Sequence, residues 1–185
     1  MDATKTNYTS YPACNCEVHK GFYDAEQRVI NEVITEVKRL KGLHPTAAVK
    51  TTGHSLGAAL ASLTAMDLIK AGYPTSTYNF GSPRVGTAAF SSFVGTVMTD
   101  LWRVTHTRDM VPHNPGSGGL LNFWHTCREE YEDGAGNVHS CSATNCEDPT
   151  CADQWASWQL DISAHLVYLG MCMGQGCGYC LPPIN

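Results

Sequence analysis

Hydrophobic and polar residues alternate along this 185-residue chain with two different periods. Between Asp24 and Leu40, apolar residues recur every three or four positions, which predicts one helix with a single apolar face. They are Val29, Ile30, Val33, Ile34, Val37 and Leu40. Farther along, strand-like segments at 47–52, 75–80 and 101–107 alternate with helix-forming segments at 56–71 and 88–98. This alternation predicts an α/β protein with a largely parallel sheet.

The two ends of the chain are less regular. Residues 1–17 are polar and contain a proline, which indicates an N-terminal arm ahead of one domain over residues 18–185. Residues 124–131 and 138–140 flank an Asp-Gly pair, and this arrangement predicts a hairpin. Residues 161–171 are expected to form a short final helix. The length is sufficient for a single domain with its own core.

Composition excludes several classes of partner. The chain is 43% hydrophobic and 16% charged, with a formal net charge of −5. It has no basic cluster that would favour nucleic acid and no apolar run long enough to cross a membrane. The first residues are polar and do not resemble a signal peptide. We therefore expect neither a nucleic-acid partner nor a transmembrane segment.

Nine cysteines are many for a chain of this length, and most of them follow residue 126. Their setting among glycine, proline, asparagine and aspartate is typical of disulfide-stapled loops in secreted proteins. Zinc is the alternative, because Cys177 and Cys180 have C-x-x-C spacing and Cys14 and Cys16 add two thiols. No second C-x-x-C accompanies them, so we expect disulfides, no metal and no cofactor. An odd count leaves at least one thiol free or bonded outside the chain. The glycosylation sequon at residues 7–9 also fits a secreted or secretory-pathway protein.

Residues Gly53–Gly57 read G-H-S-L-G between a strand-like segment and a helix-forming run. Strand, tight glycine turn and helix form the setting in which a serine becomes a nucleophile. The turn exposes the Ser55 hydroxyl, and the helix N-terminus favours developing negative charge. The alternative is an ordinary glycine turn with Ser55 as a helix cap.

An acid and a base are expected downstream of such a serine, in the order Ser, Asp or Glu, His. Asp109 is the best-placed acid because it follows the C-terminal end of a strand, where α/β active sites form. His165, at the start of a late apolar run, is the preferred base, and His125 is its rival. His54, inside the turn, is interpreted as a structural residue.

Five motifs then occur in a fixed order. They are V-H-K-G-F at 18–22, T-G-H-S-L-G at 52–57, N-F-G-S-P-R-V-G at 79–86, R-D-M-V-P at 108–112 and H-L-V-Y at 165–168. In these motifs the chain resembles the class 3, fungal-type lipases, which have the α/β-hydrolase fold and include feruloyl esterases. The resemblance implies Ser55 as nucleophile, Asp109 as acid, His165 as base and the Leu56 backbone N–H as an oxyanion-hole donor. It also implies a disulfide between Cys141 and Cys151, with Cys146 as an extra cysteine.

The function implied by the resemblance is carboxylic ester hydrolysis through an acyl-enzyme. A triacylglycerol lipase acting on lipid or ester at a lipid–water interface is the first expectation. A feruloyl-type or short-chain esterase is the alternative among enzymes. An inactive lipase-fold fragment or binding module is the alternative outside enzymes.

The chain departs from the family at its N-terminus. Family members carry a longer segment before V-H-x-G-F, with a lid, a second oxyanion donor and a strand beside the nucleophile strand. The sequence is therefore expected to be N-terminally truncated relative to the family, with segment 47–52 at a sheet edge. Three explanations are open: a fragment of a longer domain, pairing with a separate N-terminal segment or another copy, and an arm over residues 1–17 that covers the edge.

Overall fold

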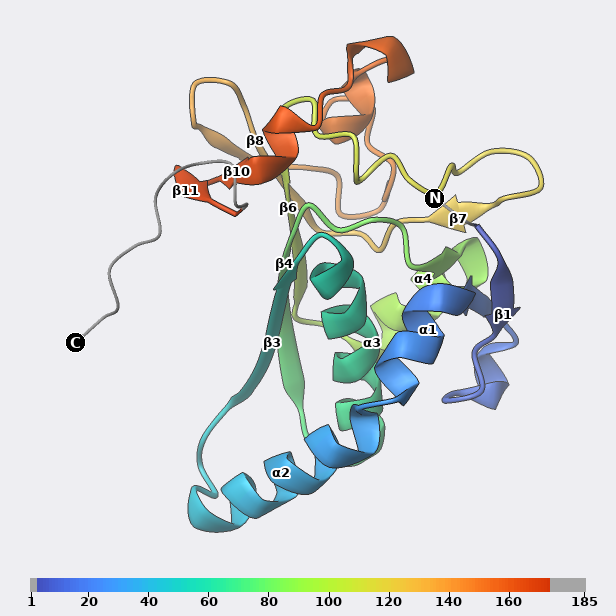
Figure 1. Cartoon of the computed structure of the whole chain (residues 1–185), viewed down its shortest axis with the longest axis vertical. Helices are drawn as coiled ribbons and strands as arrows, with labels where there is room; N and C mark the ends of the chain where they lie inside the picture. The colour runs from blue at the N-terminus through green and yellow to red at the C-terminus, as the bar shows by residue number, and fades with distance from the viewer. Residues whose placement is uncertain (1–2, 174–185) are drawn as a thin grey trace.

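A five-stranded sheet forms the centre of the molecule in the computed structural model, which describes residues 3–173 (Figure 1). Its strand order is β3-β4-β6-β8-β9, and the strands are β3 Val49–His54, β4 Thr75–Phe80, β6 Leu101–His106, β8 Glu129–Glu132 and β9 Val138–Ser140. The first four strands are parallel, and β9 is antiparallel to β8. The predictions of an α/β protein and of the 138–140 hairpin strand are confirmed. Among the described residues β3 is an edge strand, as expected.

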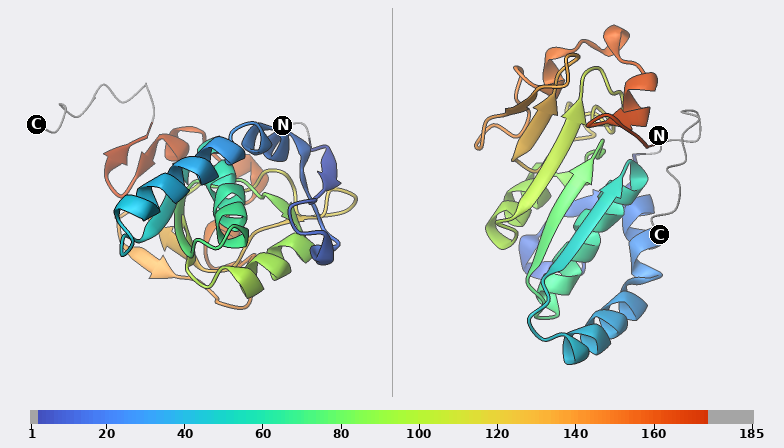
Figure 2. Two further views of the ribbon diagram at one scale, coloured as in Figure 1. Left: turned by 90° about the horizontal axis from the view of Figure 1, so that it is seen from below. Right: turned by 90° about the vertical axis from the view of Figure 1, so that its left-hand side faces the viewer.

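Three helices cover one side of this sheet, as the two views of Figure 2 show. They are α1 Lys20–Gln27, α3 Leu56–Lys70 and α4 Ala88–Val97. The central helix α3 buries most of its length, including Ala59, Leu63 and Met66, which are fully enclosed. The main core forms where these side chains meet Val18 and Phe90. Packing against α3 thus fixes the helix that follows Ser55.

A second, smaller sheet contains part of the N-terminal segment. Its antiparallel strands are β1 Lys5–Asn7, β2 Glu17–His19, β5 Gly86–Thr87 and β7 Phe123–Trp124, and a 3-10 helix spans Pro12–Cys14. Residues 5–7 pair with residues 17–19. They therefore lie in a different sheet from β3 and do not pair with its edge. The segment at 124–131, expected as one strand, is divided between β7 and β8.

The helix predicted between Asp24 and Leu40 is wrong in its extent, because it is two helices. The first, α1, begins earlier because the His19 ring caps it by accepting from Phe22 N at 3.3 Å. The second, α2 Ile30–Leu43, buries only Ile30. Since α1 packs on α3 more extensively than α2 does, the chain turns between the two helices, at residues 28–29. Apolar spacing cannot detect this break, because both helices continue the same pattern.

The final helix predicted at 161–171 is also wrong. A 3-10 helix at Ser163–Leu166 leads into a hairpin of β10 Val167–Tyr168 and β11 Met171–Cys172. Leu169 and Gly170, at the turn, have φ of 51° and 72°, which an α-helix does not allow. Two further 3-10 helices, Ala152–Gln154 and Ser157–Gln159, precede this segment.

Three disulfides join cysteines of the described residues: Cys14–Cys16, Cys127–Cys146 and Cys141–Cys151. The Cys141–Cys151 bond confirms the pairing implied by the resemblance, and Cys146 has a partner of its own. Cys172 is also disulfide-bonded. The C-x-x-C pair at 177 and 180 lies outside the described residues. Cys141 and Cys151 approach Glu129 in a geometry that could hold a metal, but their sulfurs are used by the disulfide.

Within residues 3–173, no helix has the length and apolar character needed to cross a membrane.

Candidate active site

Ser55 lies in a sharp turn between β3 and α3. Its backbone has φ of 59° and ψ of −130°, a conformation that non-glycine residues rarely adopt. The Ser55 N–H donates to the carbonyl of Phe80 on the neighbouring strand at 3.1 Å. A Cβ on Gly53 would lie 2.2 Å from the carbonyl oxygen of Gly57, so the turn requires glycine there. Strain of this kind is held where the surrounding structure enforces it, and it is common at functional sites.

Asp109 and His165 are brought together from distant parts of the chain. Asp109 follows the end of β6, and its Oδ2 accepts from His165 Nδ1 at 2.7 Å. Both side chains are buried. Since an ionised carboxylate only accepts, Nδ1 is the donor, which in the neutral ring leaves the lone pair on Nε2. His165 Nε2 is buried and has no hydrogen-bond partner among the described residues, so no hydrogen bond joins it to Ser55 Oγ in this structure.

Tyr168 is a member of the site that the sequence reasoning missed. Its hydroxyl donates to Asp109 Oδ2, the same oxygen that accepts from His165. Asp109 Oδ1 accepts from Val111 N at 2.8 Å, so both carboxylate oxygens are fixed. Burial, followed by the nearby Asp109 charge, raises the pKa of Tyr168 well above its usual value, which keeps the hydroxyl protonated as a donor. The H-L-V-Y motif contains this tyrosine, three residues after the histidine, but does not identify Asp109 as its partner.

His54 connects the serine turn to the segment that carries His165. Its Nε2 donates to the backbone carbonyl of His165 at 2.8 Å, and the two rings lie 4.3 Å apart between centroids. His106 Nδ1 donates to the carbonyl of Ala164 at 2.9 Å, one residue earlier. Burial lowers the pKa of His54, which favours the neutral ring. These contacts are consistent with the structural interpretation of His54.

Gly81 shows how closely the elements of the site approach one another. It follows β4 directly after Phe80, whose carbonyl oxygen accepts from the Ser55 N–H. A Cβ built on Gly81 would lie 2.9 Å from Asp109 Oδ2 and 2.9 Å from His165 Cε1. The acid and the histidine therefore pack directly on the backbone beside the serine turn.

His125, the rival base, lies elsewhere. It is buried, and its Nε2 donates to the carbonyl of Pro112 at 2.7 Å. Its backbone N–H donates to Glu147, which also forms a bidentate pair with the buried Arg84 guanidinium. Burial lowers the pKa of His125 well below its usual value. These contacts place His125 in a buried polar network, and within residues 3–173 no hydrogen bond joins it to Asp109.

Leu56 is the first residue of α3, directly after Ser55. The first N–H groups of a helix have no acceptor within the helix. The Leu56 N–H is therefore suited to receive negative charge that develops beside Ser55.

Comparisons with known proteins place these observations in a wider context. Residues 1–118 match the family model described as lipase (class 3). A secreted mono- and diacylglycerol lipase from Fusarium solani is 40% identical over 119 residues, which cover 64% of this chain and 35% of that protein. A lipase from Rhizopus niveus is 32% identical over 176 residues, covering 91% of this chain and 44% of that protein. The chain thus spans less than half the length of these curated relatives.

Solved structures show the same likeness. Lipase II from Rhizopus niveus superimposes with a TM-score of 0.85 at 30% identity, over 94% of this chain and 66% of that one. A triacylglycerol lipase, described as having a serine protease triad at its catalytic centre, superimposes with a TM-score of 0.82 at 31% identity. The superposition covers 92% of this chain and 65% of the triacylglycerol lipase chain. The shared fold is therefore that of fungal lipases with the α/β-hydrolase architecture.

Proposed function

Because this chain belongs to the class 3 lipase family, we propose that it hydrolyses carboxylic esters of acylglycerols through Ser55, His165 and Asp109. The observation that carries the proposal is the buried 2.7 Å hydrogen bond between Asp109 Oδ2 and His165 Nδ1. His165 Nε2 is left without a partner among the described residues. The His165 ring packs on the ring of His54, the residue that precedes Ser55. A serine on a strained turn beside such a histidine suits nucleophilic acyl transfer.

The proposed reaction has two steps. His165 Nε2 takes the hydroxyl proton of Ser55 as Oγ attacks the ester carbonyl, and the alcohol leaves with that proton. Water then attacks the acyl-enzyme, with His165 again accepting and returning a proton. Asp109 orients the imidazole and stabilises its charged form, and Tyr168 holds the carboxylate in place. The Leu56 N–H donates to the oxyanion, a kind of contact worth roughly 10²–10³ in rate.

An apolar acyl group is the substrate feature best supported by the surface. Exposed apolar side chains stand close in sequence to each of the three proposed catalytic residues: Leu56 after Ser55, Met110 after Asp109, and Ile162 before His165. The names of the relatives, mono- and diacylglycerol lipase and triacylglycerol lipase, point to glycerol esters. We therefore propose acylglycerols, triacylglycerol first, met at a lipid–water interface.

The proposal extends to where the protein works and what it meets. Three disulfides and the secreted relatives support an extracellular or secretory-pathway location. The unpaired edge of β3 supports pairing with a further strand, from a separate segment or a second copy. Light scattering would detect pairing with either partner as a molecular mass above that of a single chain.

Substrate hydrolysis tests the function directly. The chain is assayed on emulsified triolein, on p-nitrophenyl esters of increasing acyl length and on methyl ferulate, with Ser55→Ala as control. Hydrolysis of triolein and long-chain esters that Ser55→Ala abolishes supports the proposal. Preference for methyl ferulate favours the feruloyl-type esterase. No hydrolysis of any ester by folded protein favours the inactive or binding module.

A further inference from the structure

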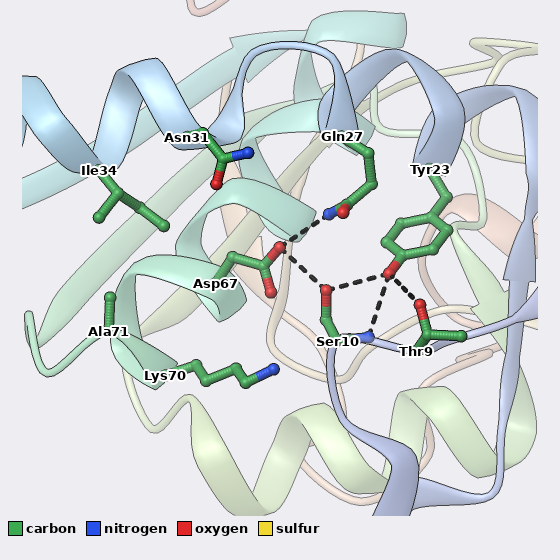
Figure 3. Close-up of a pocket in the computed structure, with 9 residues that line it drawn as sticks. All are labelled: Thr9, Ser10, Tyr23, Gln27, Asn31, Ile34, Asp67, Lys70 and Ala71. Atoms are coloured by element: carbon green, nitrogen blue, oxygen red, sulfur yellow. Dashed lines mark hydrogen bonds between the residues drawn. The ribbon is translucent and has the colours of Figure 1, made fainter.

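A polar pocket of about 400 Å³ lies at the end of α3 opposite to Ser55 (Figure 3). Three parts of the chain that are distant in sequence meet there: Thr9 and Ser10 of the N-terminal segment, Tyr23 of α1, and Asp67 of α3. Because each helical residue advances about 1.5 Å, Asp67 lies roughly 18 Å along α3 from Ser55. The pocket is therefore separate from the candidate active site.

Asp67 is the residue in this pocket with unmet hydrogen-bonding capacity. Its side chain is largely buried, with 7% of the residue exposed. Oδ2 accepts from Ser10 Oγ at 3.0 Å and from Gln27 Nε2 at 3.0 Å, as Figure 3 shows. Oδ1 is buried and has no hydrogen-bond partner among the described residues. Burial raises the pKa of this carboxyl. A buried acceptor without a donor is costly, so the site is incomplete as it stands.

The rest of the pocket offers donors as well as acceptors. Lys70, one turn after Asp67 on α3, lines the same pocket, with its ammonium 5.7 Å from the centre of the Tyr11 ring. The Asn31 amide lines the wall formed by α2. One carboxylate and one ammonium give the lining a net charge near zero. An ion of either sign would meet one like charge, whereas a neutral compound with several hydroxyls could use both.

We propose that this pocket binds a small neutral polyhydroxyl compound, of the size of a monosaccharide or a short polyol. One hydroxyl donates to Asp67 Oδ1, and an adjacent hydroxyl accepts from Lys70 Nζ. The pocket volume lies within the range of small-molecule sites. The bound compound touches the N-terminal segment, α1, α2 and α3, which all contribute residues to the pocket. This site does not depend on ester hydrolysis, and its ligand is not the proposed substrate.

A titration of the whole chain with D-xylose tests the proposal. Binding is followed by the NMR chemical shifts of the backbone amides. D-xylose at millimolar concentration is expected to shift residues 9–10, 23–31 and 67–71 with a saturating curve. Asp67→Asn keeps an acceptor for Ser10 and Gln27 but replaces the free oxygen with a donor. It should weaken binding by roughly tenfold or more, as a lost hydrogen bond to a charged group does. Lys70→Met should weaken it too, while Lys38→Met, on the exposed side of α2, should not.

Several results would overturn the proposal. One is a response linear in D-xylose concentration, or spread over the surface. Another is unchanged affinity in Asp67→Asn or, if that variant does not fold, in Lys70→Met. Tighter saturable binding of ethylammonium than of D-xylose would identify a cation site instead. Labelling of Ser55 by a fluorophosphonate in the same samples keeps this test separate from that of the proposed hydrolase function.

Discussion

Replacing Gly81 by alanine is expected to disable the proposed acid–base pair with little change elsewhere. Gly81 has φ of +56°, and its added Cβ would lie 2.7 Å from the Tyr168 hydroxyl oxygen. The same atom would lie 2.9 Å from Asp109 Oδ2 and 2.9 Å from His165 Cε1. These atoms belong to three residues that hydrogen bonds join into one group, so a single methyl group pushes on the whole arrangement.

The close contacts set the expected loss of rate, and the backbone conformation sets the expected loss of stability. Ordinary Cβ contacts begin at 3.4 Å, so Asp109, His165 or the backbone must move by 0.5 Å or more. Because a misplacement of about 1 Å can reduce a rate by about 10²-fold, we expect a loss between roughly 10-fold and 100-fold. The positive φ adds a separate loss of stability of about 1–2 kcal/mol for alanine.

Gly72→Ala provides the matched control. Gly72 also has a positive φ, +92°, but a Cβ there would meet nothing within 4 Å. Both variants should lose stability in urea unfolding because of the positive φ, with a further roughly 1–3 kcal/mol lost in Gly81→Ala because its Cβ overpacks buried groups. Only Gly81→Ala should lose rate. The rate is measured as fluorophosphonate labelling of Ser55 under conditions in which both variants are folded. Full labelling rate in Gly81→Ala, or an equal loss in Gly72→Ala, would refute the reasoning.

Three further outcomes concern stability. Burial raises the pKa of Glu26 from 4.5 to about 7, so the folded state holds this proton more tightly than the unfolded state. The unfolding free energy should therefore fall by up to about 3 kcal/mol as pH rises from about 4.5 through 7, and Glu26→Gln should flatten that dependence in urea titrations. Replacing Cys141 and Cys151 by serine should lower the unfolding free energy by roughly 2–4 kcal/mol, read from the urea midpoint. Arg84→Met leaves the buried Glu147 carboxylate unpaired and should lose about 3–5 kcal/mol, of which adding Glu147→Gln should restore part.

The parts of the fold that the sequence predicted are those with strong local signals. Strand 75–80 lies between a glycine-proline turn and a glycine, and the structure gives the same bounds. The helix after Ser55 is composed of strong helix formers and is observed at Leu56–Lys70. The serine turn is itself local, because Gly53 has no Cβ to collide with the Gly57 carbonyl four residues later. Such features are set by neighbouring residues and can be inferred from them.

The remaining features depend on contacts between distant residues. The break between α1 and α2 follows from packing on α3, where Gln27 reaches Asp67. The hairpin at 167–172 forms where the Leu169 N–H donates to Glu132, a carboxylate on β8. Tyr168 joins the site through a contact with Asp109 that spacing alone does not reveal. No local pattern specifies these partners, so the final segment was predicted as a helix.

The central claim is that His165, held by Asp109, activates Ser55. Its most direct test is mass spectrometry of the folded chain after reaction with a fluorophosphonate, comparing the unmodified sequence with His165→Ala. We expect one adduct on the peptide that contains Ser55, formed at least roughly 10²-fold more slowly in His165→Ala. No adduct on Ser55 in folded protein, or an adduct whose rate is the same in His165→Ala, would contradict the account.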